Sequence, residues 1–202
     1  GAINRLLYSS IYNARATAAT LRLPDDSLCA TLLIAKLEED CFHTICSGDG
    51  VVAAKTHDGL IVVHEYDFKS GAPYYARYEL EDSLKAGYFK SLGKEGTHTT
   101  YSIKPDGTIS EKHELPFLFD EKNICFEERF PLADFETVTV LSDGAKAFVK
   151  QENSATSRRQ IPVDSALIVK ELTSYKGYVG EFVQRRAQKA FKGFREQGMQ
   201  NI

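Results

Sequence analysis

The chain has 202 residues, which is enough for one substantial hydrophobic core. Its apolar content of 43% is ordinary for a soluble globular protein, and its net charge of -3 gives no electrostatic attraction to nucleic acid or to an anionic membrane. The sequence lacks an apolar run of roughly 18 residues, a secretory signal pattern and a C-x-x-C pair. We therefore expect a cytoplasmic protein with reduced thiols and with neither nucleic acid nor membrane as a partner. Its oligomeric state cannot be predicted from the sequence.

The first half of the chain predicts a helix followed by strands. Apolar residues at three- and four-residue spacing predict an amphipathic helix over residues 3–19. Residues 30–40 and 41–48 then favour two strands, the first of them buried. Residues 51–66 have β-rich arms on both sides of Asp58-Gly59, which predicts a hairpin with a two-residue type I′ turn.

The middle of the chain predicts a short helix and more antiparallel strands. Residues 82–92 favour a helix behind an aspartate cap. A second hairpin is predicted over residues 97–115, turning on Asp106-Gly107, and residues 123–130 and 135–141 favour further strands.

The last third is predicted to be helical apart from one polar loop. The spacing of Ala147, Phe148 and Val149 indicates a helix after Asp143-Gly144, and residues 151–164 are expected to form the loop. Further helices are predicted over about 163–172 and 178–196. The arginines and lysines of the last helix favour a solvated face, with a phosphate- or partner-binding patch as the alternative. The element order predicts an α+β fold, in which antiparallel sheets are flanked by helices, in a single domain over residues 1–202.

Asp-Gly occurs four times, and two of these pairs lie between the arms of the predicted hairpins. Asp49 differs because Gly48 and Gly50 flank it, which lets the backbone approach closely and directs the carboxylate outward. Asp143 differs because it ends a predicted strand and precedes a predicted helix. It is therefore either a helix cap or a ligand.

Carboxylates at strand ends beside glycines suit hard divalent cations such as Mg²⁺ or Mn²⁺, which take oxygen ligands. A cation held there could activate a water molecule for attack on phosphorus. Sequence patterns of serine hydrolases, P-loop proteins and zinc proteases are absent. Among the five dispersed histidines, His98 is the one to consider as an acid, although a plain polar strand residue is the simpler interpretation.

Two segments carry recognisable short motifs: residues 30–52, "ATLLIAKLEEDCFHTICSGDGVV", and residues 138–148, "VTVLSDGAKAF". They resemble motifs of the metal-dependent PP2C-type serine/threonine protein phosphatases, including bacterial members. The first is similar to the part of that family in which a "TLL" strand leads by a hairpin into a "GDS" or "GDG" turn, and the second to its "LxSDG" motif. The resemblance extends over roughly residues 28–198 and includes the closing helix.

The resemblance implies an α-β-β-α sandwich that hydrolyses phosphoserine and phosphothreonine in proteins with a water activated by Mg²⁺ or Mn²⁺. By motif, Asp143 matches a core metal ligand and Asp49 matches the aspartate of an additional, weaker metal. Gly144 and Gly50 match the backbone glycines of the metal site, with Gly144 as the glycine that allows the turn.

Two family motifs have no match in this sequence: the early "DGxGG" and the acidic pair after the final helix. We therefore expect either a fragment of a longer phosphatase or a catalytically inactive, pseudophosphatase-like binding module. The substrate, the activity and the metal preference are not given by the sequence.

Overall fold

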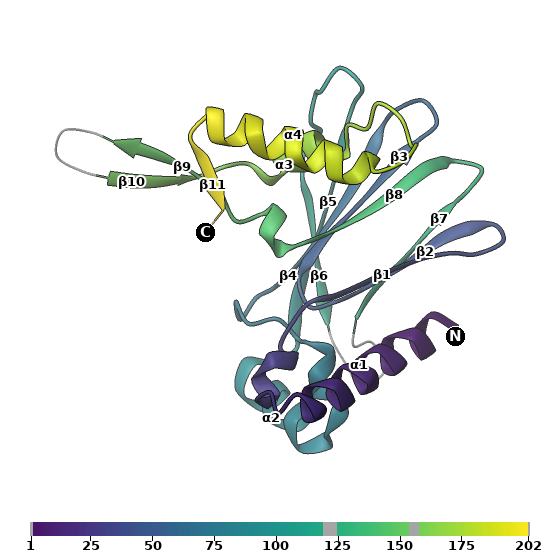
Figure 1. Ribbon diagram of the computed structural model, residues 1–202, viewed down its shortest axis with the longest axis vertical. Helices are drawn as coiled ribbons and strands as arrows, with labels where there is room; N and C mark the ends of the chain where they lie inside the picture. Colours follow the sequence, from purple (N-terminus) through teal and green to yellow (C-terminus); the bar gives the residue numbers. More distant parts are fainter. Residues whose placement is uncertain (1, 119–124, 154–157, 202) are drawn as a thin grey trace.

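The computed structural model describes residues 2–118, 125–153 and 158–201 (Figure 1). The helices are α1 (Ala2–Thr20), α2 (Asp82–Leu92), α3 (Ser165–Thr173) and α4 (Phe182–Glu196). Short 3₁₀ turns are η1 (Asp25–Leu28), η2 (Ala76–Leu80) and η3 (Asp143–Ala145). In the described residues, no helix is both long and apolar enough to cross a bilayer.

The strands of the described residues form three antiparallel sheets. Sheet A has the order β1-β2-β7, with β1 (Leu32–Leu37), β2 (Cys41–Ser47) and β7 (Phe126–Pro131). Sheet B has the order β6-β5-β4-β3-β8, with β3 (Gly50–Thr56), β4 (Ile61–Phe68), β5 (Glu95–Ile103), β6 (His113–Leu118) and β8 (Phe135–Ser142). Sheet C has the order β10-β9-β11, with β9 (Phe148–Asn153), β10 (Arg158–Pro162) and β11 (Met199–Asn201). The predicted α+β class with antiparallel sheets is confirmed.

Sheets A and B pack face to face. Side chains alternate between the two faces of a strand, and residues paired directly across an antiparallel ladder share a face. Val52 and Tyr66 therefore lie on the inner face of sheet B, where the Tyr66 ring stacks on Phe126 of sheet A at a centroid distance of 4.2 Å. The inner faces form one apolar cluster, which Leu7 and Ile11 of α1 join from the side of sheet A.

The other face of sheet B is covered by α3 and α4. Val51 and Val63 point to this side and are fully buried together with Ile168 of α3 and Phe194 of α4. Figure 1 shows α3 and α4 on one side of the sheets and α1 and α2 on the opposite side. The layer order is therefore helix, sheet A, sheet B, helix. Sheet A lies between α1 and sheet B, and sheet B lies between sheet A and the helices α3 and α4.

Several local elements lie where the sequence predicts them, while some of their details differ. Helix α1 and the hairpin of β3 and β4 lie where the sequence predicts them, and β5 and β6 pair across Asp106-Gly107. The predicted type I′ turn is wrong, since among the two turn residues only Gly59 has positive φ, at 89°. The expected aspartate cap of α2 is wrong as well, because Glu81 holds the cap position without a side-chain hydrogen bond. Strand β1 is only partly buried, not fully as expected.

The largest corrections follow Asp143. The predicted helix around Ala147, Phe148 and Val149 is the turn η3 followed by strand β9. Such a short apolar run does not distinguish helix from strand, and here pairing with β10 and β11 decides. The expected polar loop over 151–164 contains the arms of the β9–β10 hairpin, while residues 154–157 lie outside the described residues, as do 123 and 124 of a predicted strand.

The last helix begins four residues later than predicted. Gly180 precedes α4 with φ at 65°, a left-handed conformation that a residue inside a right-handed helix does not adopt. Val179, which belongs to the predicted helix, is 84% exposed. Within the helix, Ala190 and Phe194 are buried, whereas Val183 and Phe191 are 55% and 44% exposed.

Candidate functional site

Carboxylates gather at one end of sheet B. Gly50 pairs with Ser142 on one side and with Tyr66 on the other. Because these ladders are antiparallel, the residue before β3, the residue after Tyr66 and the residue after β8 all lie at the same end of the sheet. We call these three residues the acidic edge: Asp49, Asp67 and Asp143. The two predicted metal ligands, Asp49 and Asp143, are thus neighbours.

Asp49 is held by the turn between β2 and β3. Its Oδ1 accepts a hydrogen bond from Thr31 Oγ1 at 3.2 Å. Gly48 has φ at 102°, and a Cβ there would lie 2.7 Å from Thr31 Oγ1, so only glycine fits. At Gly50, a Cβ would approach the carbonyl oxygen of Leu141 to 3.0 Å. The expectation that these glycines permit close backbone approach is therefore confirmed.

The charge of Asp143 acts on the carboxyl group of Asp49. The pKa of Asp49 is raised, first by its burial and second by the negative charge of Asp143, while Lys146 and Thr31 act in the opposite direction. The pKa of Tyr75 is also raised by burial, and then by Asp49 and Asp143. Tyr75 precedes η2, so this turn brings a phenol ring near the acidic edge. A half-buried carboxylate that lies close to a second negative charge favours a bound cation.

Lys146 lies across the same edge. Its Nζ donates to the carbonyl oxygen of Tyr66 at 2.9 Å and to Oδ1 of Asp67. The side chain is 15% exposed and reaches from the β8 side of the sheet to β4, across the end of β3. The ammonium group of Lys146 therefore offsets part of the negative charge of the acidic edge.

Asp143 does not cap a long helix. It begins η3, whose cap position is Ser142, and its backbone carbonyl accepts from the N–H of Lys146 at 2.7 Å. Within the described residues its carboxylate makes no hydrogen bond, and the residue is exposed. This leaves the carboxylate available to a ligand.

Gly144 contributes differently from the expectation. Its φ is outside the left-handed region, and an added Cβ would make only ordinary contacts, the nearest to Ser142 Oγ at 3.4 Å. The turn therefore does not require glycine at this position, contrary to the role expected from the family resemblance. The Gly144 carbonyl accepts from Asn201 Nδ2, which fixes η3 to strand β11.

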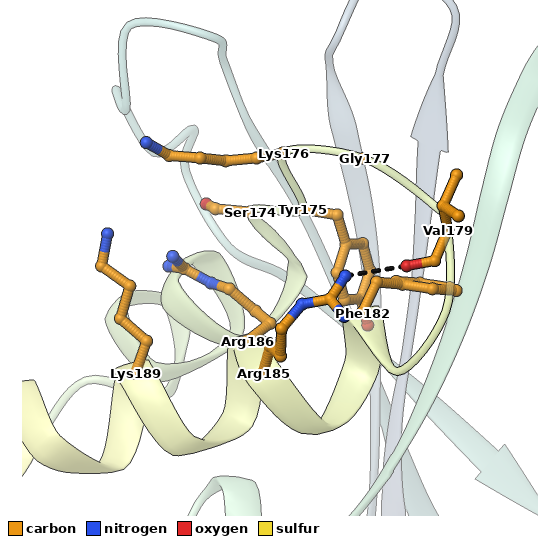
Figure 2. Close-up of a pocket in the computed structure, with 9 residues that line it drawn as sticks. All are labelled: Ser174, Tyr175, Lys176, Gly177, Val179, Phe182, Arg185, Arg186 and Lys189. Carbon is orange, nitrogen blue, oxygen red and sulfur yellow. Dashed lines mark hydrogen bonds between the residues drawn. The ribbon is translucent and has the colours of Figure 1, made fainter.

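Helix α4 lines several hollows of the described part of the chain. A largely apolar groove of about 730 Å³ begins at Ser142 and Gly144 and continues along Phe191 and Arg195. A smaller pocket of about 360 Å³ lies at the other end of the helix. Figure 2 shows the ends of Lys176, Arg186 and Lys189 on one side of this pocket and the Arg185 guanidinium bonded to the Val179 carbonyl. Arg186 is paired with Glu171 at 2.6 Å, so part of the basic face is already neutralised.

The acidic edge has the chemistry of a hard-cation site. Asp49 and Asp143 offer charged oxygens, which Mg²⁺ and Mn²⁺ prefer, and small numbers of protein ligands are common where such ions retain water. The negative charge of Asp143 raises the pKa of Asp49, and a cation held by the two carboxylates would relieve this, although the ammonium of Lys146 already offsets part of the negative charge.

Sequence reasoning did not find Asp67, Thr31 or Lys146. Asp67 is an ordinary strand residue in the sequence, and Thr31 is 18 positions from Asp49. Lys146 lies three residues after Asp143, so its proximity could have been noticed, but its reach across β3 depends on sheet pairing.

His98, the histidine considered as an acid, lies on the inner face of sheet B, in the row of Gly50 and Tyr66. With strands about 4.8 Å apart, it is two strands, or roughly 10 Å, from Gly50. His98 is therefore two strands from β3 and three from β8, which places it well away from Asp49 and Asp143.

Comparison with protein-family models, with curated proteins and with solved structures found no match.

Proposed function

We propose that this protein is a metal-dependent phosphatase of the PP2C kind, which hydrolyses phosphoserine and phosphothreonine in protein substrates. The observation that carries the proposal is the juxtaposition of Asp49 and Asp143 at one end of sheet B, since the two aspartates come from motifs about 94 residues apart (143 − 49). The order of helix, sheet, sheet, helix supports it, because the PP2C-like sandwich has the same layers.

In this proposal Asp49 and Asp143 hold Mg²⁺ or Mn²⁺, the cofactor expected from the sequence. When bound, such an ion supplies positive charge for a phosphoryl group and lowers the pKa of water. Thr31 orients Asp49 through its hydrogen bond, and Gly48 and Gly50 keep the turn close to β1 and β8. The groove beside Gly144 provides an apolar surface next to the acidic edge, where a polypeptide substrate would lie.

The test measures hydrolysis of p-nitrophenyl phosphate and of a phosphothreonine peptide with and without Mn²⁺. We expect Mn²⁺-dependent turnover that Asp143→Asn abolishes. The matched control is Asp106→Asn, because Asp106 stands in the same dipeptide but serves a hairpin turn, accepting from Thr108 N at 2.8 Å. Turnover that is independent of Mn²⁺, or that survives Asp143→Asn, would contradict the proposal.

Lys146 favours a second candidate, a pseudophosphatase-like module that binds a partner without catalysis. An ammonium group that neutralises Asp67 and acts on Asp49 can replace part of the charge of a metal ion. Absence of turnover in the wild type and in Lys146→Met, together with binding of a phosphopeptide, would favour this module over the enzyme. Metal-dependent turnover would exclude it.

A further inference from the structure

Three chemically suited side chains meet between the two sheets, away from the acidic edge. We call them the histidine cluster: His64 of β4, His98 of β5 and Glu128 of β7. Tyr66 pairs with His98 and Gly50, which places His64 and His98 on the inner face of sheet B. Glu128 alternates with Phe126, whose ring stacks on Tyr66, so Glu128 also points into the space between the sheets.

The facing atoms are close to one another. His64 Nδ1 lies 2.8 Å from His98 Nε2, and Glu128 Oε1 lies 3.5 Å from the first and 3.7 Å from the second. Tetrahedral Zn²⁺ has bonds of about 2.0–2.2 Å to nitrogen and carboxylate oxygen, so its ligand atoms lie about 3.4 Å apart. The three observed separations bracket this value, and the cluster therefore has the dimensions of one face of a zinc tetrahedron.

The rings are held by aromatic neighbours. His64 packs edge-on against Phe130 at a centroid distance of 5.5 Å, and His98 packs against Tyr66 at 5.0 Å. The side chains of His64, His98 and Glu128 are 14%, 18% and 29% exposed. The cluster is thus packed by rings and mostly enclosed, and Glu128 is the most exposed of its three side chains.

Without a cation, the three facing atoms satisfy one another only in part. One proton between His64 Nδ1 and His98 Nε2 makes one hydrogen bond and leaves the Glu128 carboxylate 3.5 Å or more from both nitrogens. A proton on each nitrogen would place two donors face to face at 2.8 Å. In the described residues, the ion pairs of the Glu128 carboxylate are with these two histidines. A cation would satisfy all three atoms at once.

We propose that His64 Nδ1, His98 Nε2 and Glu128 Oε1 bind one divalent transition-metal ion of the Zn²⁺ class, which joins sheet A to sheet B. Two imidazoles and one carboxylate favour zinc-like ions over Mg²⁺. The acidic edge offers only carboxylate oxygens and therefore favours Mg²⁺ or Mn²⁺. The site is independent of the proposed phosphatase activity.

The test uses metal-free wild-type protein titrated with Zn²⁺ by calorimetry and with Co²⁺ by absorption spectroscopy. We expect one ion per chain and a Co²⁺ spectrum of tetrahedral type without the thiolate charge-transfer band that binding to the four free cysteines would give. His98→Gln and Glu128→Gln should each weaken Zn²⁺ binding by about 100-fold or more. Substitution of a residue that only supports a metal ligand already lowers metal affinity about 10- to 100-fold, and loss of a ligand should cost at least as much.

The matched control is His113→Gln, which changes an exposed histidine of β6. This variant should bind Zn²⁺ like the wild type. Circular dichroism of each variant separates loss of a ligand from loss of the fold, and Glu128→Gln retains size and shape if His98→Gln does not fold. Absence of Zn²⁺ binding by the wild type, unchanged affinity in folded Glu128→Gln, or a thiolate band would overturn the proposal.

Discussion

The acidic edge and the histidine cluster lie in different parts of the sandwich, with Gly50 and His98 two strands or roughly 10 Å apart in sheet B, and they differ in almost every physical respect. The acidic edge lies at strand ends, with exposed Asp143 and half-buried Asp49, and its charges repel one another. The histidine cluster lies between the sheets among aromatic rings. Strand ends give open, charged sites suited to a substrate, whereas the sandwich interior gives a closed site suited to holding two layers together.

The largest expected effect concerns stability through the histidine cluster. An ion bound only to the folded state, at a free concentration 1,000 times its Kd, raises the free energy of unfolding by about 4 kcal/mol. Urea denaturation with and without Zn²⁺ should show this difference in the wild type and not in His98→Gln. Equal stabilisation of both proteins would show that Zn²⁺ acts elsewhere.

The next effect concerns the turn that supports the acidic edge. Gly48→Ala combines a left-handed backbone with a clash against Thr31 and should destabilise the protein by about 2–3 kcal/mol. Gly71→Ala is the control, because Gly71 also has positive φ but nothing within 4 Å of the added Cβ, and should cost about 1 kcal/mol. Equal losses in the two variants, measured by urea denaturation, would mean that the clash with Thr31 contributes nothing.

A smaller effect should follow removal of the lysine that crosses the acidic edge. Lys146→Met leaves Asp67 without its ammonium partner and should strengthen Mn²⁺ binding by about tenfold, or roughly 1.4 kcal/mol. Lys112→Met, which removes a comparable ion pair with Asp164 on another part of the surface, is the control. Calorimetric titration with Mn²⁺ measures both. Unchanged or weaker binding in Lys146→Met would show that Lys146 does not compete with the ion.

The smallest effect is a pH dependence at Asp49. Because the folded-state pKa of this carboxyl is raised, its ionised form costs stability above the folded pKa, and the cost disappears as the pH falls below the unfolded value. Asp49→Asn should therefore be slightly more stable than the wild type at pH 7, while the difference vanishes in acid. A variant that is less stable at pH 7 would contradict this sign.

Much of the acidic edge could be predicted from local sequence. The glycines beside Asp49 and the strand that ends at Asp143 are visible in short windows, and the register of β3 with β8 then brings the two aspartates together. The histidine cluster could not be predicted, because His64 and His98 are 34 residues apart and Glu128 comes from the other sheet. No spacing rule relates residues on facing sheets.

The sequence by itself determined the elements whose information is local. Helix α1 follows from its apolar spacing, and the β3–β4 hairpin from its β-rich arms around Asp58-Gly59. Tertiary structure decided that Phe148 and Val149 lie in a strand, since β10 and β11 supply the hydrogen bonds that a short apolar run cannot specify. It also decided which side chains meet between the sheets, because strand register and sheet packing fix those contacts over long separations in the chain.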